Sequence, residues 1–261
     1  DNFDTLKDFT RQQQIEPVLN KLRQFTLRPG LRNVLGQAKP KFSLTDLFYQ
    51  RKIVLVPLNK GIIGGECARL LGSLIVGLTW TLALSRAKLP PEKRHIVAVY
   101  IDELQDYLSL PTDLSDALTQ ARGLGLSLTL AHQYRDQLPA NIRAGIDANA
   151  LNKIVFGLNA TDAKAMAAMA PELTAEDFMR LPRYQVYASL QAGERATGWI
   201  RGKTLPPEKA IRMPAELKAV SQKRFGKPAA EVEQEYLSVI NGATAAPPET
   251  PDAPIGRRKR C

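Results

Sequence analysis

Four short apolar runs, separated by segments of helical character, restrict the fold of this chain more than any other feature. The runs cover residues 52–58, 95–101, 126–131 and 151–158 and are rich in Val, Ile and Leu. Strands that are apolar on both faces and alternate with helices are typical of a parallel sheet covered on both sides. The sequence therefore predicts an α/β fold built on a mostly parallel sheet.

The segments between these runs predict the remaining elements. Residues 65–86 form a long apolar helix, and residues 114–125 a helix that ends in glycines. Residues 160–170 form a helix with Thr161 as its candidate N-cap, and residues 184–200 a hairpin that turns at Ala192 and Gly193. Helical spacing is also present in four shorter segments near the ends of the chain, which are 13–25, 44–51, 214–226 and 229–242.

Four regions follow from this pattern. Residues 1–50 form a helical segment, residues 51–205 the α/β core, and residues 206–242 two peripheral helices. Residues 243–261 are rich in Pro and Ala and lack core-forming side chains, so we expect a disordered basic tail.

The charge is unevenly distributed along the 261 residues. The net charge is +10, yet residues 61–200 carry 13 Lys and Arg against 14 Asp and Glu, so the excess lies in the two flanks. Basic flanks fit a polyanionic partner, although they can also serve solubility alone. The two cysteines, Cys67 and Cys261, provide neither a disulfide framework nor a Cys-based zinc site, which favours the cytoplasm.

One segment, "LLGSLIVGLTWTLAL" at residues 70–84, is apolar enough to suggest a membrane helix. Its 15 residues are fewer than the roughly 20 needed to cross a bilayer. We therefore expect a helix buried in the core and no membrane span. The start of the sequence also has no signal-peptide pattern.

Two acids follow the second apolar run directly, in "VAVYIDEL". Ligands of α/β folds bind at the carboxyl ends of the strands, where Asp102 and Glu103 would lie. A carboxylate there can hold Mg²⁺ through water, and its neighbour can orient or deprotonate a water beside a nucleotide γ-phosphate. The plainer alternative is that Asp102 caps a turn and Glu103 is solvated.

Polar residues also follow the third run. His132 and Gln133 would face the same edge of the sheet, where an amide can sense a phosphate or hold a water. His132 alone is more often a packing residue, and no second His has ligand spacing. Arg122 ends the preceding helix, where it could neutralise the helix dipole or act as an arginine finger for a neighbouring subunit.

These motifs resemble the HerA/FtsK-like P-loop ATPases, and most closely the coupling proteins of type IV secretion systems that transport DNA in conjugation. "VAVYIDEL" is similar to the Walker B strand of that family. The blocks before and after it are similar in order to the family's elements: "KIVLVPLNKGIIGGECARLLGSLIVGLTW", "LSDALTQARGLGLSLTLAHQ" and "NKIVFGLNATDAKAMA". The resemblance covers about residues 50–200, and the order of the blocks is more specific than any single motif.

The resemblance implies a RecA-like three-layer sandwich that binds ATP and Mg²⁺. Asp102 would position the metal, Glu103 would activate water, Gln133 would be the sensor, and Arg122 would be the finger acting in trans. It also implies a homo-hexameric ring that moves DNA, a relaxase or secretion channel as partner, and a location in the cytoplasm or at the cytoplasmic face of the inner membrane. Residues 1–50 would be the end of an inserted all-α domain.

The P-loop of the family, G-x-x-x-x-G-K-[ST], is absent from the sequence. "GWIRGKT" at residues 198–204 has the wrong spacing and is followed by two prolines. "NKGIIGGECARLL" at residues 59–71 has the right shape but no Lys-Ser/Thr pair, and flexible backbone explains its glycines. Either the P-loop lies upstream of Asp1, or the chain is a degenerate paralogue. The intact acids, arginine and glutamine favour the first, so we expect the chain to be a C-terminal half that is inactive alone.

A second class of function stays open, which is a non-catalytic DNA-binding or docking module that uses the basic flanks. A dinucleotide-dependent enzyme is disfavoured, because no G-x-G-x-x-G follows a predicted strand.

Overall fold

The computed structural model describes residues 27–37, 39–108 and 114–243, together with residues 13, 15–17, 19–20 and 23. The chain divides into two compact units, one of Asp1–Phe42 with Arg212–Cys261 and the other of Ser43–Ile211. All the candidate site residues lie in the second unit. The predicted helix at 13–25 falls partly outside the described residues, and so does the predicted tail, from residue 244 onward.

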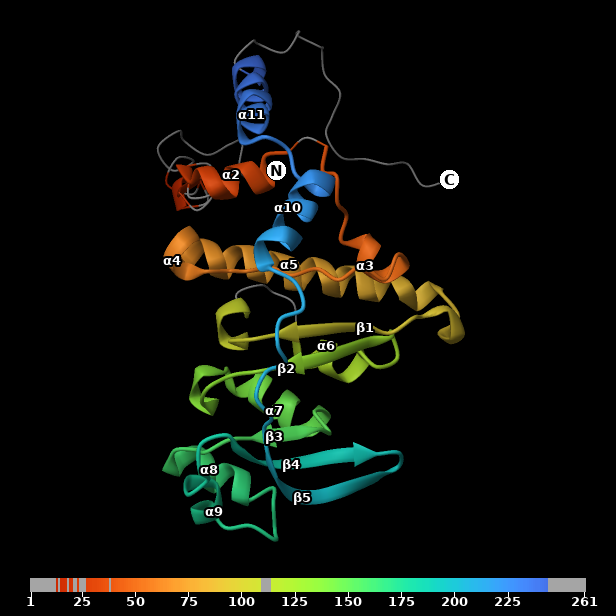
Figure 1. The fold of residues 1–261 in the computed structure, drawn as a ribbon, viewed down its shortest axis with the longest axis vertical. Helices are drawn as coiled ribbons and strands as arrows, with labels where there is room; N and C mark the ends of the chain where they lie inside the picture. The colour runs from red at the N-terminus through yellow and green to blue at the C-terminus, as the bar shows by residue number, and fades with distance from the viewer. Residues whose placement is uncertain are drawn as a thin grey trace. The chain divides into compact units, whose positions relative to one another are not determined.

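The second unit alternates helices and strands (Figure 1). Three helices come first, namely α3 (Thr45–Tyr49), α4 (Lys60–Ile63) and α5 (Gly65–Ser85). The middle contains β1 (Val97–Ile101), the 3-10 turn η3 (Leu104–Tyr107), α6 (Leu114–Gln120), β2 (Leu126–Leu130), the 3-10 turn η4 (Arg135–Gln137) and α7 (Ala140–Asn149). The last elements are β3 (Lys153–Val155), α8 (Ala160–Ala167), α9 (Ala175–Met179), β4 (Gln185–Ala192) and β5 (Arg195–Lys203).

The strands form two sheets. β1 and β2 pair in parallel, with Val97 opposite Leu126 and Ile101 opposite Leu130. β3, β4 and β5 form an antiparallel sheet, in which β4 and β5 are the predicted hairpin. Its turn falls at Gly193 and Glu194, one residue later than predicted. The fold is therefore mixed α/β with a parallel pair, as predicted, but two sheets replace the single, mostly parallel one.

The first predicted strand, at 52–58, is not formed. No ladder of hydrogen bonds pairs these residues with a strand of the described chain, and a strand needs a partner for its N–H and C=O groups. The side chains of Ile53 and Leu55 are 91% and 83% exposed. The fourth predicted strand shortens to β3, because only its central residues meet β4.

The β1–β2 sheet has one buried face. Val97, Ile101 and Leu126 pack in the core with Trp80 and Ala83 of α5. On the other face Tyr100 is 77% exposed, and its neighbours Ala98, Ser127 and Thr129 are exposed as well. The predicted cover of helices on both sides is therefore present on one side only.

Helix α5 is longer than the apolar stretch that suggested a membrane helix. By length and composition, Gly65–Lys88 could cross a bilayer, and a third of its most apolar window is buried. A core helix of a globular protein meets the same criterion, and one face of α5 packs against β1 and β2.

The antiparallel sheet has its own core. Phe178 of α9 is fully buried between the rings of Tyr187 and Trp199, with centroid distances of 5.4 and 5.6 Å. Helix α8 packs on this cluster through Ala163 and Met166. Its N-cap is Asn159, which accepts a hydrogen bond from the N–H of Asp162, and the prediction of Thr161 as the cap was wrong.

The first unit contains α2 (Pro29–Leu35), α10 (Pro214–Phe225) and α11 (Ala229–Ala243). Leu31 of α2 and Val232 of α11 are buried, and Arg32 binds Glu233 through two hydrogen bonds of 2.9 and 2.6 Å. The last predicted helices are therefore formed, while the four regions predicted from sequence stay predictions.

Candidate functional site

The candidate site lies where the two parallel strands end. Backbone pairing continues past both strands, because the N–H of Ala131 donates to the Ile101 carbonyl and the N–H of Leu104 to the Ala131 carbonyl, both at 2.9 Å. These two bonds hold the loop after β1 beside the loop after β2. As a result, Glu103 and Gln133, which are 30 residues apart in sequence, come into contact.

The Glu103 carboxylate lies between two amides. Gln133 donates from Nε2 to Glu103 Oε1 at 2.6 Å, and Gln105 donates from Nε2 to Oε2. The backbone of Glu103 is left-handed, with φ of 53° and ψ of 51°. Few non-glycine residues adopt this conformation, which costs of order 1–3 kcal/mol and is concentrated at functional sites. Its side chain is half-buried. The geometry thus holds one carboxylate in a defined place.

Asp102 is held differently. Its Oδ1 accepts a hydrogen bond of 3.1 Å from the N–H of Glu103, and its side chain is exposed. The described residues contain no group of three or more His, Cys, Asp or Glu that could bind a metal by themselves. Mg²⁺ bound with nucleotides often takes only one or two carboxylates and completes its shell with water and phosphate. Asp102 fits that kind of site.

A buried acid beside the site was not found from the sequence. Asp106 of η3 is 7% exposed and forms ion pairs with Lys60 at 2.5 Å and Arg69 at 3.4 Å. The two cations come from α4 and α5, so this acid ties both helices to the loop after β1. In the sequence, Asp106 is visible only as a third acid four residues after Asp102. The sequence does not show which cations will pair with it.

The glycine loop at 59–64 has a structural explanation. Asn59 caps α4 by accepting from the N–H of Gly61, and Gly64 turns the chain into α5 with φ of 83°. Backbone conformation therefore accounts for Gly64, whereas Gly61 and Gly65 lie in helices and have no positive φ.

His132 lies beside the site and is half-buried. Burial lowers the pKa of its imidazole below the ordinary value of 6.5, and the neighbouring Arg135 lowers that pKa further. The ring is therefore neutral at neutral pH.

Arg122 lies at the other end of the strands. It precedes β2, whose five residues span about 13 Å, whereas Asp102 and Glu103 follow β1. Its side chain is exposed, and the turn that carries it is held by Arg94, whose Nη1 donates to the Gly123 carbonyl at 2.6 Å. The structure thus brings Glu103 and Gln133 together and leaves Arg122 apart from them.

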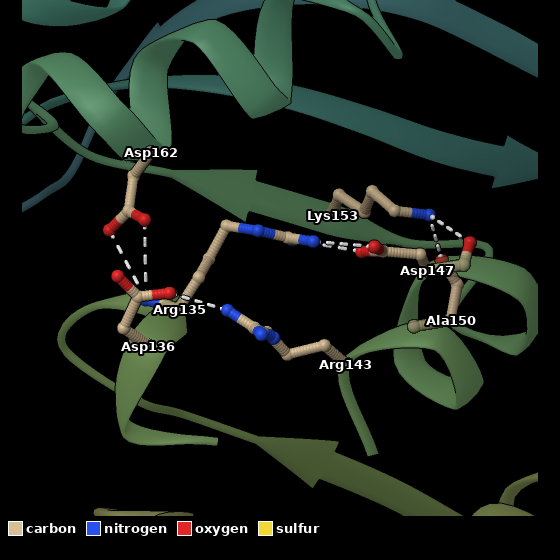
Figure 2. A network of polar contacts seen from close by, with 7 residues as sticks. All are labelled: Arg135, Asp136, Arg143, Asp147, Ala150, Lys153 and Asp162. Atoms are coloured by element: carbon tan, nitrogen blue, oxygen red, sulfur yellow. Dashed lines mark hydrogen bonds and ion pairs between the residues drawn. The ribbon is translucent and has the colours of Figure 1, made fainter. Parts of the chain in front are cut away.

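Just beyond Gln133 lies a network of charged residues (Figure 2). Arg135 binds both carboxylate oxygens of Asp147, at 2.9 and 2.5 Å, and Lys153 donates to the carbonyls of Asp147 and Ala150. The pKa of Asp147 lies below its ordinary value, first because of the Arg135 hydrogen bonds. The sequence shows these charges but not their pairing.

Comparison with solved structures finds bacterial conjugative coupling proteins. The plasmid coupling protein TrwB, bound to a non-hydrolysable ATP analogue, is 25% identical over 58% of this chain and 40% of that chain, with a TM-score of 0.47. TrwB bound to ADP and Mg²⁺ is 24% identical over 56% and 39%, with a TM-score of 0.45. The matched proteins belong to the group that the sequence motifs resemble. This chain spans about 40% of their length. No protein-family model and no curated protein matches the sequence.

Proposed function

We propose that this chain provides the hydrolytic half of a ring-forming, ATP-driven DNA translocase of the coupling-protein type. The observation that carries the proposal is the Glu103 carboxylate, held between the amides of Gln105 and Gln133 at the carboxyl ends of adjacent parallel strands. Bound nucleotide is expected at this edge in α/β folds. The core would be the Walker B part of a RecA-like sandwich, working in the cytoplasm or at the inner membrane.

The residues divide the chemistry among them. Asp102, being exposed, would hold Mg²⁺ through water, and the metal would neutralise charge on the phosphates of ATP. Glu103 would accept a proton from the attacking water, and the amide of Gln133 would orient that water. No residue here takes the part of the P-loop, so the phosphates would have to be held by a segment that this sequence does not contain.

Arg122 fits a role in trans. Arg122 is exposed, and it lies about 13 Å or more from the two carboxylates. It therefore cannot serve the site formed by its own chain in this arrangement. A head-to-tail ring would place this end of one subunit against the site of the next. A homo-hexamer with a relaxase or secretion channel as partner is the assembly that this proposal implies.

The decisive experiment is Glu103→Gln in the complete protein that carries a P-loop. General-base catalysis contributes about 10²–10⁴-fold, so we expect DNA-stimulated ATP hydrolysis to fall by that factor while ATP binding is retained. Glu92→Gln is the matched control, because Glu92 is exposed and lies before β1. An unchanged hydrolysis rate in Glu103→Gln would overturn the proposal.

A DNA-docking module is the second candidate. It is favoured by the cationic side chains exposed at the amino ends of β1 and β2, which are Arg51, Lys88, Lys93 and Arg122. This candidate predicts DNA binding that weakens steeply with salt, in a complete protein without ATPase activity.

A further inference from the structure

The segment that carries Gln133 has little regular structure of its own. β2 ends at Leu130 and η4 begins at Arg135, so four residues connect them. Gln133 is exposed and has a flexible side chain, which loses rotamer freedom when it is held against Glu103. The backbone bonds of Ala131 to Ile101 and Leu104 hold the start of the connection, so its other end must be held as well if the amide is to stay at 2.6 Å from the carboxylate.

Arg135 is anchored from two helices at once. Its backbone N–H donates to both carboxylate oxygens of Asp162 in α8, at 3.4 and 3.2 Å, and its guanidinium forms the two-bond pair with Asp147 of α7. Figure 2 shows Asp162 at the backbone of Arg135 and Asp147 at the end of its side chain. Two parallel N–H to carboxylate bonds fix direction as well as distance, which a single point charge does not.

Both anchoring acids are themselves held. Asp162 is 4% exposed. Its Oδ2 accepts a hydrogen bond of 3.1 Å from Asn159 Nδ2, and its backbone N–H donates to Asn159 Oδ1 at 2.9 Å. Asp147 lies beside Lys153, the first residue of β3. A neighbouring ion pair, between Arg143 of α7 and Asp136 of η4 at 2.5 Å, also connects these two elements. The turn η4, which follows the connection after β2, is therefore attached to α7 and α8.

We propose that Arg135 is a positioning residue whose guanidinium pair with Asp147 sets the Gln133 amide against the Glu103 carboxylate, while its backbone N–H holds η4 to Asp162. Arg135 does not touch the site itself, and it acts two residues away by fixing the backbone of the connection. The role of that amide in hydrolysis rests on the proposed function, but its placement does not.

The test follows the Gln133 side-chain amide by ¹⁵N NMR in the 261-residue chain. The hydrogen bond to Glu103 protects one of the two amide protons, so Arg135→Ala should raise the exchange rate of that proton by about tenfold and remove its hydrogen-bonded chemical shift. Arg180→Ala is the matched control, because it also removes an arginine ion pair, with Glu176, on a helix of the same unit. This control should leave the Gln133 signal unchanged.

Asp147→Asn keeps the proposal testable if Arg135→Ala does not fold. It keeps the shape of the side chain and removes its charge, so it should shift the Gln133 signal in the same direction. An unchanged Gln133 signal, in whichever variant keeps the backbone signals of β1 and β2, would overturn the positioning role and leave the proposed function untouched. Conversely, a null result for Glu103→Gln hydrolysis would overturn the function and leave the placement of Gln133 untouched.

Discussion

Asp147 shows how a single charge pair makes this structure sensitive to pH. Hydrogen bonds from Arg135 lower the pKa of its carboxyl below the model-peptide value of 3.8, partial burial opposes them, and Arg143 and Lys153 lower it further. The unfolded chain therefore binds this proton at a higher pH than the folded one. The pair contributes stability that is present above about pH 4 and is lost as the pH falls through the folded pKa.

We expect Asp147→Asn to lose stability relative to the wild type at pH 6 and to approach it at pH 3. At each pH, the unfolding free energy of the wild type minus that of Asp147→Asn reports the titration of this carboxyl alone, because the other acids titrate in both proteins. Urea unfolding between pH 3 and 6 measures it. A difference that is constant across this range would show that Asp147 does not titrate with the fold.

At the scale of elements, α5 is fitted to the turn that follows the candidate acids. Gly72 of α5 faces Tyr107 of η3, and a Cβ at position 72 would lie 2.2 Å from the tyrosine ring and 2.8 Å from Leu58. Such a contact cannot be made without moving the ring. The glycine thus allows the close approach of α5 to the loop after β1.

We expect Gly72→Ala to destabilise the fold by about 1–2 kcal/mol, since overpacking costs about 1–3 kcal/mol and the gain in helix propensity offsets up to about 1 kcal/mol. Gly65→Ala is the control, because Gly65 lies in the same helix and a Cβ there would meet nothing within 4 Å. Urea unfolding of both variants decides the matter. Equal stabilities would mean that Tyr107 moves aside at little cost.

Element types could be predicted well from the sequence, while sheet membership could not. The patterns of β1, β2, α5 and the β4–β5 hairpin are local, and they indicated these elements within a few residues. Pairing depends on which segments meet in space, so neither the missing strand at 52–58 nor the antiparallel pairing of β3 was visible. One signal was overlooked: "LSLTL" in β2 alternates apolar and polar residues, which predicts a single buried face.

The candidate site shows the same division. The position of Glu103 and Gln133 after consecutive parallel strands was enough to predict that they would lie at one edge. The partners of Asp106 and Arg135 come from α4, α5, α7 and α8, and no local pattern indicates which of several acids and cations on these helices will pair.

At the scale of the Ser43–Ile211 unit, charged side chains are distributed unevenly between the two ends of the parallel strands. Asp102, Glu103 and Asp106 follow β1, while exposed Lys88, Lys93 and Arg122 precede β1 or β2. Asp106 is paired with Lys60 and Arg69, and Glu92 lies among the cations. The difference in sign between the two ends therefore rests on Asp102 and Glu103 against Lys88, Lys93 and Arg122, and it suits a head-to-tail contact between copies.

Exposed apolar side chains also gather on this unit. Ile53 and Leu55 lie in the unpaired segment at 52–58, and Ile96 and Tyr100 lie at the start and on the open face of β1, where they are 79% and 77% exposed. Arg51 Nη2 is 3.4 Å from His95 Nδ1, so this segment begins beside the start of β1. Unpaired backbone next to exposed apolar surface is a template for pairing with another chain.

We therefore expect the 261-residue chain to self-associate with rising concentration, as measured by sedimentation velocity. Replacing Ile53 and Leu55 together by Ser should shift the distribution toward the monomer, because it removes apolar area beside the open sheet. Ile211→Ser is the matched control, since Ile211 is 96% exposed but lies outside the strands and the 52–58 segment, and it should change nothing. A wild-type chain that stays monomeric would overturn the prediction. An Ile211 variant that dissociates as much as the double variant would show that general hydrophobicity, and not this open face, governs association.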